Sequence, residues 1–268
     1  MHQDLLNFIK NKSSSLVRTP EDMLHFSCLQ NTISPGLIKY FSEEEKNKSS
    51  KDWQPDFSYY INDIGFRGEY PSIDDLRLLG FFGCSVTFGQ GVPEDKIYAN
   101  LISQHYNKKY LNFGIPGASC HRIALTFSAA VRLWNIETAI INLPPCSRLH
   151  YVDTDDRLQS ILLANKLDQP ELEYIRKEIL KNVSEQFLIS QTIDSIQWII
   201  DIAKLKNINL ILASWDNDII KIINTAFDLN AIKFNFVDKA RDGHPGIKSH
   251  EMFATDIINI LANGTYIS

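Results

Sequence analysis

Short apolar runs alternate with amphipathic segments along most of this chain. Runs of the size that buried parallel strands have lie at Leu78–Phe82, Tyr110–Phe113, Ala139–Leu143, Asn209–Ala213 and Lys233–Val237. Segments with apolar residues at helical spacing lie at Lys96–Tyr106, His121–Trp134, Ile189–Ala203, Asp218–Phe227 and Ile247–Leu261. This alternation predicts an α/β fold, a three-layer α/β/α sandwich in which helices cover both faces of a parallel five-stranded sheet.

Two regions of the chain depart from this alternation in composition or in length. Residues 1–58 are rich in serine and charge, which predicts an irregular N-terminal extension of polar loops and short helices. Residues 59–268 form the expected main domain. The stretch 149–186 is long for a strand-to-helix connection, and Glu171–Leu180 within it has helical spacing. It is either a cap over the sheet edge or an additional solvated pair of helices.

Composition and charge exclude several classes of protein. The formal net charge is −5, the sequence pI is about 5.8 and no basic cluster stands out, so nucleic acid is not an expected partner. No apolar run is long enough for a membrane span, and the N-terminus lacks the basic and apolar regions of a secretory signal. We therefore expect a cytoplasmic protein, and the sequence leaves its oligomeric state open.

The four cysteines, Cys28, Cys84, Cys120 and Cys146, are scattered and form no CxxC pair. We expect free thiols rather than a disulfide scaffold or a metal site. Three of them follow predicted strands, which leaves a thiol nucleophile as the alternative to ordinary buried cysteines.

Residues able to do chemistry follow the predicted strands, whose carboxyl ends meet at one edge of a parallel sheet. Ser85 lies in a tight turn before a helix, where a hydroxyl is presented to a substrate and backbone N–H groups can hold an oxyanion. His244 lies in a glycine- and proline-rich loop after the last strand, and Asp242 precedes it by two residues. A serine, a histidine and an aspartate are the parts of a catalytic triad.

Three segments resemble the conserved blocks of the SGNH (GDSL-type) hydrolases. Gly83-Cys84-Ser85-Val86-Thr87-Phe88-Gly89 resembles the first block, with Cys84 where the commonest form has aspartate. Asn112-Phe113-Gly114-Ile115-Pro116-Gly117 is similar to the second block, and Arg241-Asp242-Gly243-His244-Pro245-Gly246 to the last. The lead-in from Tyr60-Ile61-Asn62 to Gly65-Phe66-Arg67-Gly68 also resembles bacterial and phage members of the family.

This resemblance, which runs from about Tyr59 to Ala262, implies a flavodoxin-like fold and ester or acyl hydrolysis. It implies that Ser85 is the nucleophile, His244 its base and Asp242 the orienting acid, with the N–H of Gly117 in the oxyanion hole. No cofactor or metal is required. The expected substrate is a small-molecule or carbohydrate ester that carries a small acyl group.

Two departures from the family pattern affect the site. The third block normally supplies an asparagine side chain to the oxyanion hole, and Cys146 stands at about that place. Arg148 is the preferred substitute, either for the oxyanion or for an anionic group of the substrate, and Asn142 is the alternative. The family acid normally stands three residues before the histidine, where this chain has Arg241.

The shifted acid leaves several arrangements open. Asp242 is preferred, Asp238 and Asp216 are alternatives, and a serine–histidine dyad is a further one. A catalytically inactive binding protein for a glycan or acylated metabolite, and an assembly protein that docks through its first residues, remain as other functions. Among the remaining residues, we expect His121 at the pocket rim and His250 exposed on a helix, while Arg67 either reaches the pocket or pairs with an acid.

Overall fold

The computed structural model describes residues 36–39, 57–62, 65–69, 72, 75, 77–152, 158–163, 170–240 and 242–264. Five parallel strands form the central sheet: β3 (Leu78–Gly83), β4 (Tyr110–Gly114), β5 (Ile136–Leu143), β8 (Asn209–Ser214) and β9 (Ile232–Lys233). Their order in the sheet is β4-β3-β5-β8-β9. This is the flavodoxin-like order, in which the direction of the strand sequence reverses between β3 and β5.

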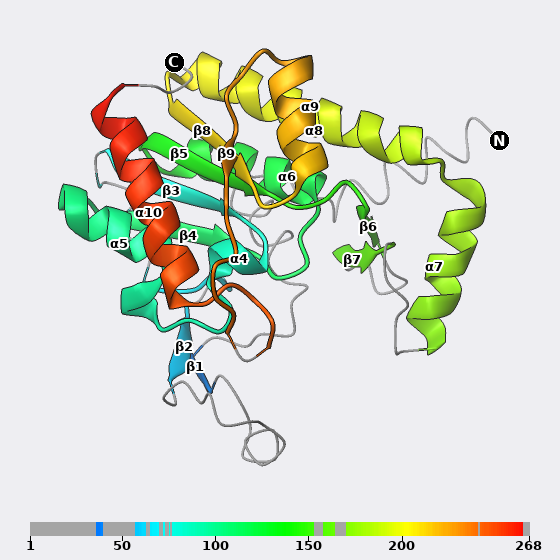
Figure 1. The fold of residues 1–268 in the computed structure, drawn as a ribbon, viewed down its shortest axis with the longest axis horizontal. Helices are drawn as coiled ribbons and strands as arrows, with labels where there is room; N and C mark the ends of the chain where they lie inside the picture. The colour runs from blue at the N-terminus through cyan, green and yellow to red at the C-terminus, as the bar shows by residue number, and fades with distance from the viewer. Residues whose placement is uncertain are drawn as a thin grey trace.

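Helices cover both faces of the sheet (Figure 1). Beside α4 (Ser85–Phe88) and a short 3₁₀ helix, Glu94–Lys96, they are α5 (Tyr98–Tyr106), α6 (Cys120–Leu133), α8 (Glu185–Lys206), α9 (Asn217–Ala226) and α10 (Ile247–Ala262). Successive side chains of a strand point to opposite faces. Phe81 accordingly contacts Tyr98 of α5, with ring centroids 5.7 Å apart, while Phe82 contacts Phe127 of α6 at 5.1 Å. Helices α5 and α10 thus share one face with Phe81, and α6 and α8 share the other.

The predicted α/β class, the parallel sheet and its order are confirmed, and one strand is shorter than expected. The last strand was expected over Lys233–Val237, but β9 ends at Lys233. Phe234 still donates its N–H to the Ser214 carbonyl, whereas the N–H groups of Val237 and Asp238 bind the Ser249 hydroxyl of α10. The chain leaves the sheet because a side chain of the following helix replaces the strand partner.

The long connection after β5 contains a hairpin and a helix. Strands β6 (Arg148–Val152) and β7 (Leu158–Leu162) pair antiparallel, and α7 (Pro170–Asn182) follows them beside the central sandwich (Figure 1). Ile161, Leu163 and Leu188 form a small apolar cluster there. Within its described residues, the insertion before α8 contains a hairpin and one helix rather than a pair of helices. Parts of the expected 149–186 cap, residues 153–157 and 164–169, lie outside the described residues.

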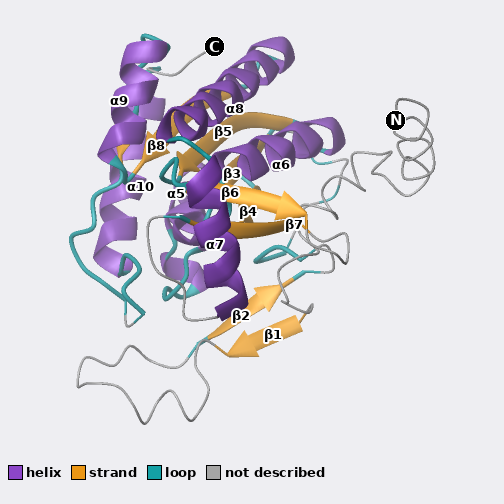
Figure 2. Cartoon of the chain, turned by 90° about the vertical axis from the view of Figure 1, so that its right-hand side faces the viewer, coloured by secondary structure: helices purple, strands orange, loops and turns teal. Residues whose placement is uncertain are grey.

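A second small sheet precedes the main one. Strand β1 (Gly36–Lys39) pairs antiparallel with β2 (Ser58–Ile61), and the pair lies outside the central sheet (Figure 2). The rest of the expected N-terminal extension, apart from Phe57, lies outside the described residues. None of the described helices is long and apolar enough to cross a membrane.

Candidate active site

The fold places the first and third strand ends at the reversal point of the sheet, where α/β proteins bind their ligands. Strand β3 leads into Ser85, the first residue of α4, and β5 leads into the turn that carries Cys146 and Arg148. Ser85 is 5% exposed, and its hydroxyl oxygen lies 3.5 Å from the Cys84 sulfur. The serine is therefore nearly buried, and Cys84 stands beside it at the position where the family that the first block resembles has aspartate.

Two glycines let α4 approach the strands closely. A Cβ on Gly83 would lie 1.9 Å from the Thr87 hydroxyl oxygen and 2.8 Å from the Asn142 carbonyl oxygen. A Cβ on Gly114, at the end of β4, would lie 2.1 Å from the backbone nitrogen of Phe88. Real Cβ atoms do not come this close, so both positions require glycine if α4 is to carry Ser85 at this height above the sheet.

His244 and Asp242 face each other in the loop before α10. The Nδ1 of His244 lies 3.2 Å from Oδ2 of Asp242, and the His244 backbone N–H donates to Oδ1 at 3.1 Å. Both atoms are buried, and the pair has the distance of an ion pair without the alignment of a hydrogen bond. Burial alone would raise the pKa of Asp242, but the adjacent His244 side chain, its charge and its backbone N–H lower it, with a smaller contribution from Gln90.

The two other candidate acids are occupied elsewhere. Asp216 accepts hydrogen bonds from the backbone N–H groups of Asp218 and Ile219, and so caps α9. Asp238 accepts from the N–H groups of Lys248 and Ser249 in the first turn of α10. The structure brings Asp242 to His244, and it uses the alternatives to satisfy helix N-termini. Arg241 lies outside the described residues.

The loop after β4 brings Gly117 to the same edge of the sheet. The Ile115 N–H donates to the Gly83 carbonyl at 3.0 Å, which ties this loop to the residue two before Ser85. Gly117 follows with a φ of +80° and is exposed. A positive φ at this point is the left-handed conformation that favours glycine. Its N–H group is thus carried by a turn that is anchored next to the serine.

The turn after β5 offers fewer donors. Pro144 and Pro145 have no N–H, and the Arg148 guanidinium reaches the Ala118 carbonyl at 3.5 Å and lies 5.6 Å from the centroid of the Trp215 ring. Asn142, the alternative donor, is fully buried within β5, and both polar atoms of its amide lack a hydrogen-bond partner among the described residues. Arg148 is therefore the one of the two with access to the sheet edge.

The cysteines and remaining histidines have ordinary surroundings. Burial raises the pKa of the Cys120 thiol, which donates to the Pro144 carbonyl at 3.4 Å, and burial also raises the pKa of Cys146. Raised pKa values disfavour thiolate nucleophiles. Within the described part of the chain, no three His, Cys, Asp or Glu residues are grouped so as to bind a metal ion. His121 is half-buried beside a cavity of about 10 Å³ between α6 and α8.

The expectation for His250 was wrong. It is fully buried, its Nδ1 accepts the Tyr98 N–H at 3.2 Å, and its ring stacks on that of Tyr98 with centroids 5.6 Å apart. Burial, followed by the charge of Arg67, lowers its pKa to about 3. The apolar positions around it in the sequence did not reveal this, because the aromatic residues that enclose it come from α5 and from the segment after β9.

The sequence did not single out Gln90, whose backbone N–H donates to the Ser85 carbonyl at 3.0 Å directly after the helix of Ser85. Its side chain also contributes to the lowered pKa of Asp242. A polar residue between two glycines, directly after the first block, was the available signal. Among the described contacts, no hydrogen bond joins Ser85 directly to His244, Gly117 or Arg148.

No family model matches this chain, and no curated protein matches it. Solved structures do. A carbohydrate esterase family 2 enzyme with its carbohydrate-binding domain, from Corynascus thermopiles (Myceliophthora fergusii), is 15% identical with a TM-score of 0.44, over 78% of this chain and 72% of that one. A G-D-S-L family lipolytic protein from Veillonella parvula is 13% identical with a TM-score of 0.43, over 70% and 99% of the two chains.

A psychrotrophic esterase from Pseudoalteromonas sp. is 10% identical with a TM-score of 0.46, over 70% of this chain and 97% of that one. The neighbours are thus GDSL-type hydrolases and carbohydrate esterases, the group that the sequence blocks resemble. At these identities, the likeness concerns the fold alone.

Proposed function

We propose that this protein is a serine ester hydrolase that acts through an acyl-enzyme. One observation carries the proposal: Asp242 and His244 face each other in the loop before α10, with Oδ2 and Nδ1 3.2 Å apart, and the nearly buried Ser85 follows the end of β3. An acid beside an imidazole, and a serine at the reversal point of an α/β sheet, are the groups that nucleophilic acyl transfer requires.

In this mechanism, the Ser85 hydroxyl attacks the ester carbonyl carbon while His244 takes its proton. Asp242 orients the imidazole and stabilises it once it is protonated. The backbone N–H groups of Ser85 and Gly117 hold the oxyanion of the tetrahedral intermediate, and Arg148 assists them. The imidazolium then protonates the departing alcohol, and water, deprotonated by His244, releases the acid from the serine.

The substrate that fits best is a polar or carbohydrate ester with a small acyl group. The cavity next to Arg148, which Cys120 and Leu188 also line, has a volume of about 10 Å³. That is room for about one water molecule, and neither Ser85 nor His244 lines this cavity, so it does not set the size of the acyl group. The half-buried guanidinium of Arg148 beside this cavity supports a polar rather than an apolar substrate.

The test is the hydrolysis of p-nitrophenyl acetate by the wild-type protein and by Ser85→Ala. We expect Ser85→Ala to lower kcat by about 10³-fold or more, because the nucleophile is removed. Ser195→Ala is the matched control, since Ser195 is equally buried but bonds only the Gln191 carbonyl within α8, and it should retain activity. Equal activity of wild type and Ser85→Ala would place the nucleophile elsewhere.

If neither protein hydrolyses the ester, the inactive binding protein becomes the better account. Binding of an acetylated oligosaccharide without turnover, measured by calorimetry, would then support that alternative. The missing third-block asparagine and the shifted acid of the last block are the features that favour it.

A further inference from the structure

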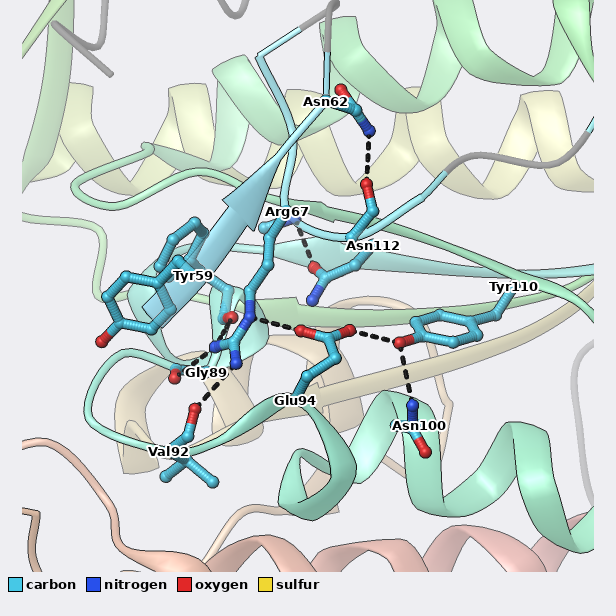
Figure 3. A network of polar contacts seen from close by, with 12 residues as sticks. Tyr59, Asn62, Arg67, Gly89, Val92, Glu94, Asn100, Tyr110 and Asn112 are labelled. Carbon is cyan, nitrogen blue, oxygen red and sulfur yellow. Dashed lines mark hydrogen bonds and ion pairs between the residues drawn. The ribbon is translucent and has the colours of Figure 1, made fainter. Parts of the chain in front are cut away.

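The lead-in motif before the central sheet carries a buried charge, Arg67, whose side chain is 0% exposed. Its guanidinium donates to the carbonyl oxygens of Phe88 at 2.9 Å, Gly89 at 2.7 Å and Val92 at 2.8 Å. Its Nε pairs with Glu94 at 2.5 Å (Figure 3). Arg67 therefore pairs with an acid, and all of its described side-chain hydrogen bonds go to the end of α4 and the segment that follows it.

Aromatic rings enclose this guanidinium. Its carbon lies 4.7 Å from the centroid of the Tyr59 ring and 5.5 Å from that of Phe88. The Tyr59 hydroxyl accepts the Gly91 N–H at 2.8 Å, so the same tyrosine binds the middle of the turn after α4. The Tyr110 hydroxyl of β4 donates to Glu94 (Figure 3). The buried charge is thus paired and enclosed, as a charge in a protein interior requires.

The other residues of the lead-in motif shape the loop that carries Arg67. The Asn62 side chain accepts the Phe66 N–H at 3.0 Å and donates to the Gly68 carbonyl at 2.9 Å. Gly65 and Gly68 have positive φ, +84° and +85°, the left-handed conformation that favours glycine. The motif is therefore a short loop, closed around one asparagine side chain, that presents Arg67 to the segment after α4.

That segment closes the helix of Ser85. Helix α4 is one turn of four residues, too short to be stable through its own hydrogen bonds, and its last carbonyl groups have no partners within it. The N–H groups of Gly89 and Gln90 both donate to the Ser85 carbonyl at 3.0 Å. Arg67 binds the next free carbonyl groups, those of Phe88 and Gly89. The backbone of Ser85 is thus fixed by a turn that Arg67 holds.

We propose that Arg67 is a positioning residue for Ser85, acting through the backbone of the turn Gly89–Val92, and that Asn62 supports it by shaping its loop. The proposal rests on the proposed function. Arg67 has no described contact with Ser85 itself, so it is not a catalytic residue. Lysine should not replace it, because an ammonium group carries the charge but not the planar fork that reaches three carbonyl groups and Glu94 together.

A double-mutant cycle with p-nitrophenyl acetate tests this route, with kcat expressed for each serine that a fluorophosphonate labels. We expect Arg67→Lys and Asn62→Ala each to lower this kcat about tenfold with little change in KM, because a small displacement of the nucleophile slows acyl transfer without removing a substrate contact. The rate constant of labelling at Ser85 should fall with kcat. In the double variant, the two effects should not multiply, because Asn62 acts through the loop that carries Arg67.

The count of labelled serines separates positioning from general destabilisation. A role in stability alone would lower the number of labelled serines and leave kcat per labelled serine unchanged. Ile223→Ala is the control with that expected result, because it opens a cavity in the core beside α9 and lowers stability without touching the turn after α4.

Tyr59→Phe keeps the proposal testable if Arg67→Lys does not fold. It keeps the ring beside the guanidinium and removes only the hydroxyl that accepts the Gly91 N–H, so kcat per labelled serine should fall about threefold. A wild-type value in Tyr59→Phe, or effects of Arg67→Lys and Asn62→Ala that multiply, would overturn the positioning role and leave the proposed function standing. A wild type that neither turns over the ester nor is labelled at Ser85 would overturn both.

Discussion

The turns after β3 and β5 begin on neighbouring strands, which pair as Gly83 with Asn142 at their ends, but they are held very differently. The turn after β3 is fixed by the Arg67 guanidinium, which donates to the Gly89 carbonyl, and by the Tyr59 hydroxyl, which accepts the Gly91 N–H. Gly89 and Gly91 both have a positive φ, which bends the turn sharply. Residues far apart in sequence converge to fix one short helix.

The turn after β5 is held mainly by its own hairpin. The Arg148 N–H donates to the Pro145 carbonyl at 3.3 Å, and the Leu163 N–H donates to the Ser147 carbonyl at 2.9 Å. The one contact of the Arg148 guanidinium with a carbonyl, that of Ala118, is at the 3.5 Å limit of a hydrogen bond. Two prolines keep the turn stiff but remove donors.

The difference shows which half of the proposed site is preorganised. In the proposed site, Ser85 stands on a helix whose following turn is held by several side chains, whereas the proposed oxyanion side depends on Gly117 and on a guanidinium with one long hydrogen bond. Catalytic groups gain most from being held in place before the substrate arrives. Substitutions on the β3 side should therefore have larger effects than substitutions on the β5 side.

The largest effect is expected from Asp242→Asn. Asparagine keeps the size of the side chain but removes the charge that stabilises the protonated imidazole, so kcat on p-nitrophenyl acetate should fall by about 10³–10⁴-fold. Asp216→Asn and Asp238→Asn are the matched controls, and both should retain activity. Each weakens a helix cap, which costs about 1 kcal/mol of stability in urea unfolding. A loss of activity in the controls, with Asp242→Asn active, would move the acid to another position.

Gly114→Ala should disrupt the packing of α4 against the end of β4. The added Cβ meets backbone atoms of Phe88 and Thr87 at 2.1–2.6 Å, and backbone cannot move aside as a side-chain end can. We expect a loss of about 3 kcal/mol or more in the free energy of unfolding, measured in urea. Gly264→Ala is the control: nothing lies within 4 Å of its Cβ, and its φ of +66° costs only about 1–2 kcal/mol. Equal losses in the two variants would contradict the close approach of α4 to β4.

The contrast between the two turns also explains what the sequence could predict. Hydrophobic spacing is a local signal, and it predicted the sheet and its covering helices because each element buries a face of its own. The glycines of the first block could be predicted for the same reason, because each acts within one helical turn. Gly83 leaves room for Thr87, and Gly89 ends α4 with a positive φ. The early end of β9 could not be predicted from the sequence, since it depends on the Ser249 hydroxyl of a later helix.

The site residues divide along the same line. Asp242 precedes His244 by two residues, so the pair could be predicted from spacing, although Asp216 and Asp238 could not be set aside until their helix-capping bonds were seen. Burial of His250 depends on contacts between distant segments, with Tyr98 of α5 and with Phe234 after β9. Tertiary contacts of this kind leave no periodic signal in the sequence.

A loss of stability at low pH is expected from His250, which is buried beside α5. His250 stacks on Tyr98, whose hydroxyl bonds Thr87 of α4, and its pKa of about 3 lies below the unfolded value. Between pH 6.5 and 3, the unfolded chain takes up a proton that the folded chain refuses, so stability falls as pH falls. One such proton costs about 1–2 kcal/mol between pH 7 and 5. His250→Asn keeps an acceptor for the Tyr98 N–H without the titration.

Urea unfolding of the wild type and His250→Asn at pH 7 and pH 5 measures this contribution. The variant should be less stable than the wild type at pH 7, because it loses ring packing, but it should lose less stability on acidification. Asp242 and Asp238 add to the loss only at lower pH, since their lowered pKa values delay protonation below the usual range of aspartate. An identical pH dependence in the two proteins would mean that His250 is protonated in the folded state.

The smallest effect is expected on the β5 side, from Arg148→Met. Methionine keeps an unbranched stem and removes the guanidinium, and the weak 3.5 Å contact predicts about a tenfold loss in kcat/KM, or about 1.4 kcal/mol of transition-state stabilisation. Two esters separate the roles that Arg148 could have. If it assists the oxyanion, p-nitrophenyl acetate and the anionic mono-p-nitrophenyl succinate should lose equally.

If Arg148 instead holds an anionic group of the substrate, only the succinate ester should lose, and the loss should shrink as salt screens the charge. Unchanged kinetics with both esters would make the contact with Trp215 the reason for the arginine, as packing at the end of β8. In that case the two N–H groups of Ser85 and Gly117 would hold the oxyanion without help. The site would then depend even more on the turn after β3, which Arg67, Gly89 and Gly91 hold in its conformation.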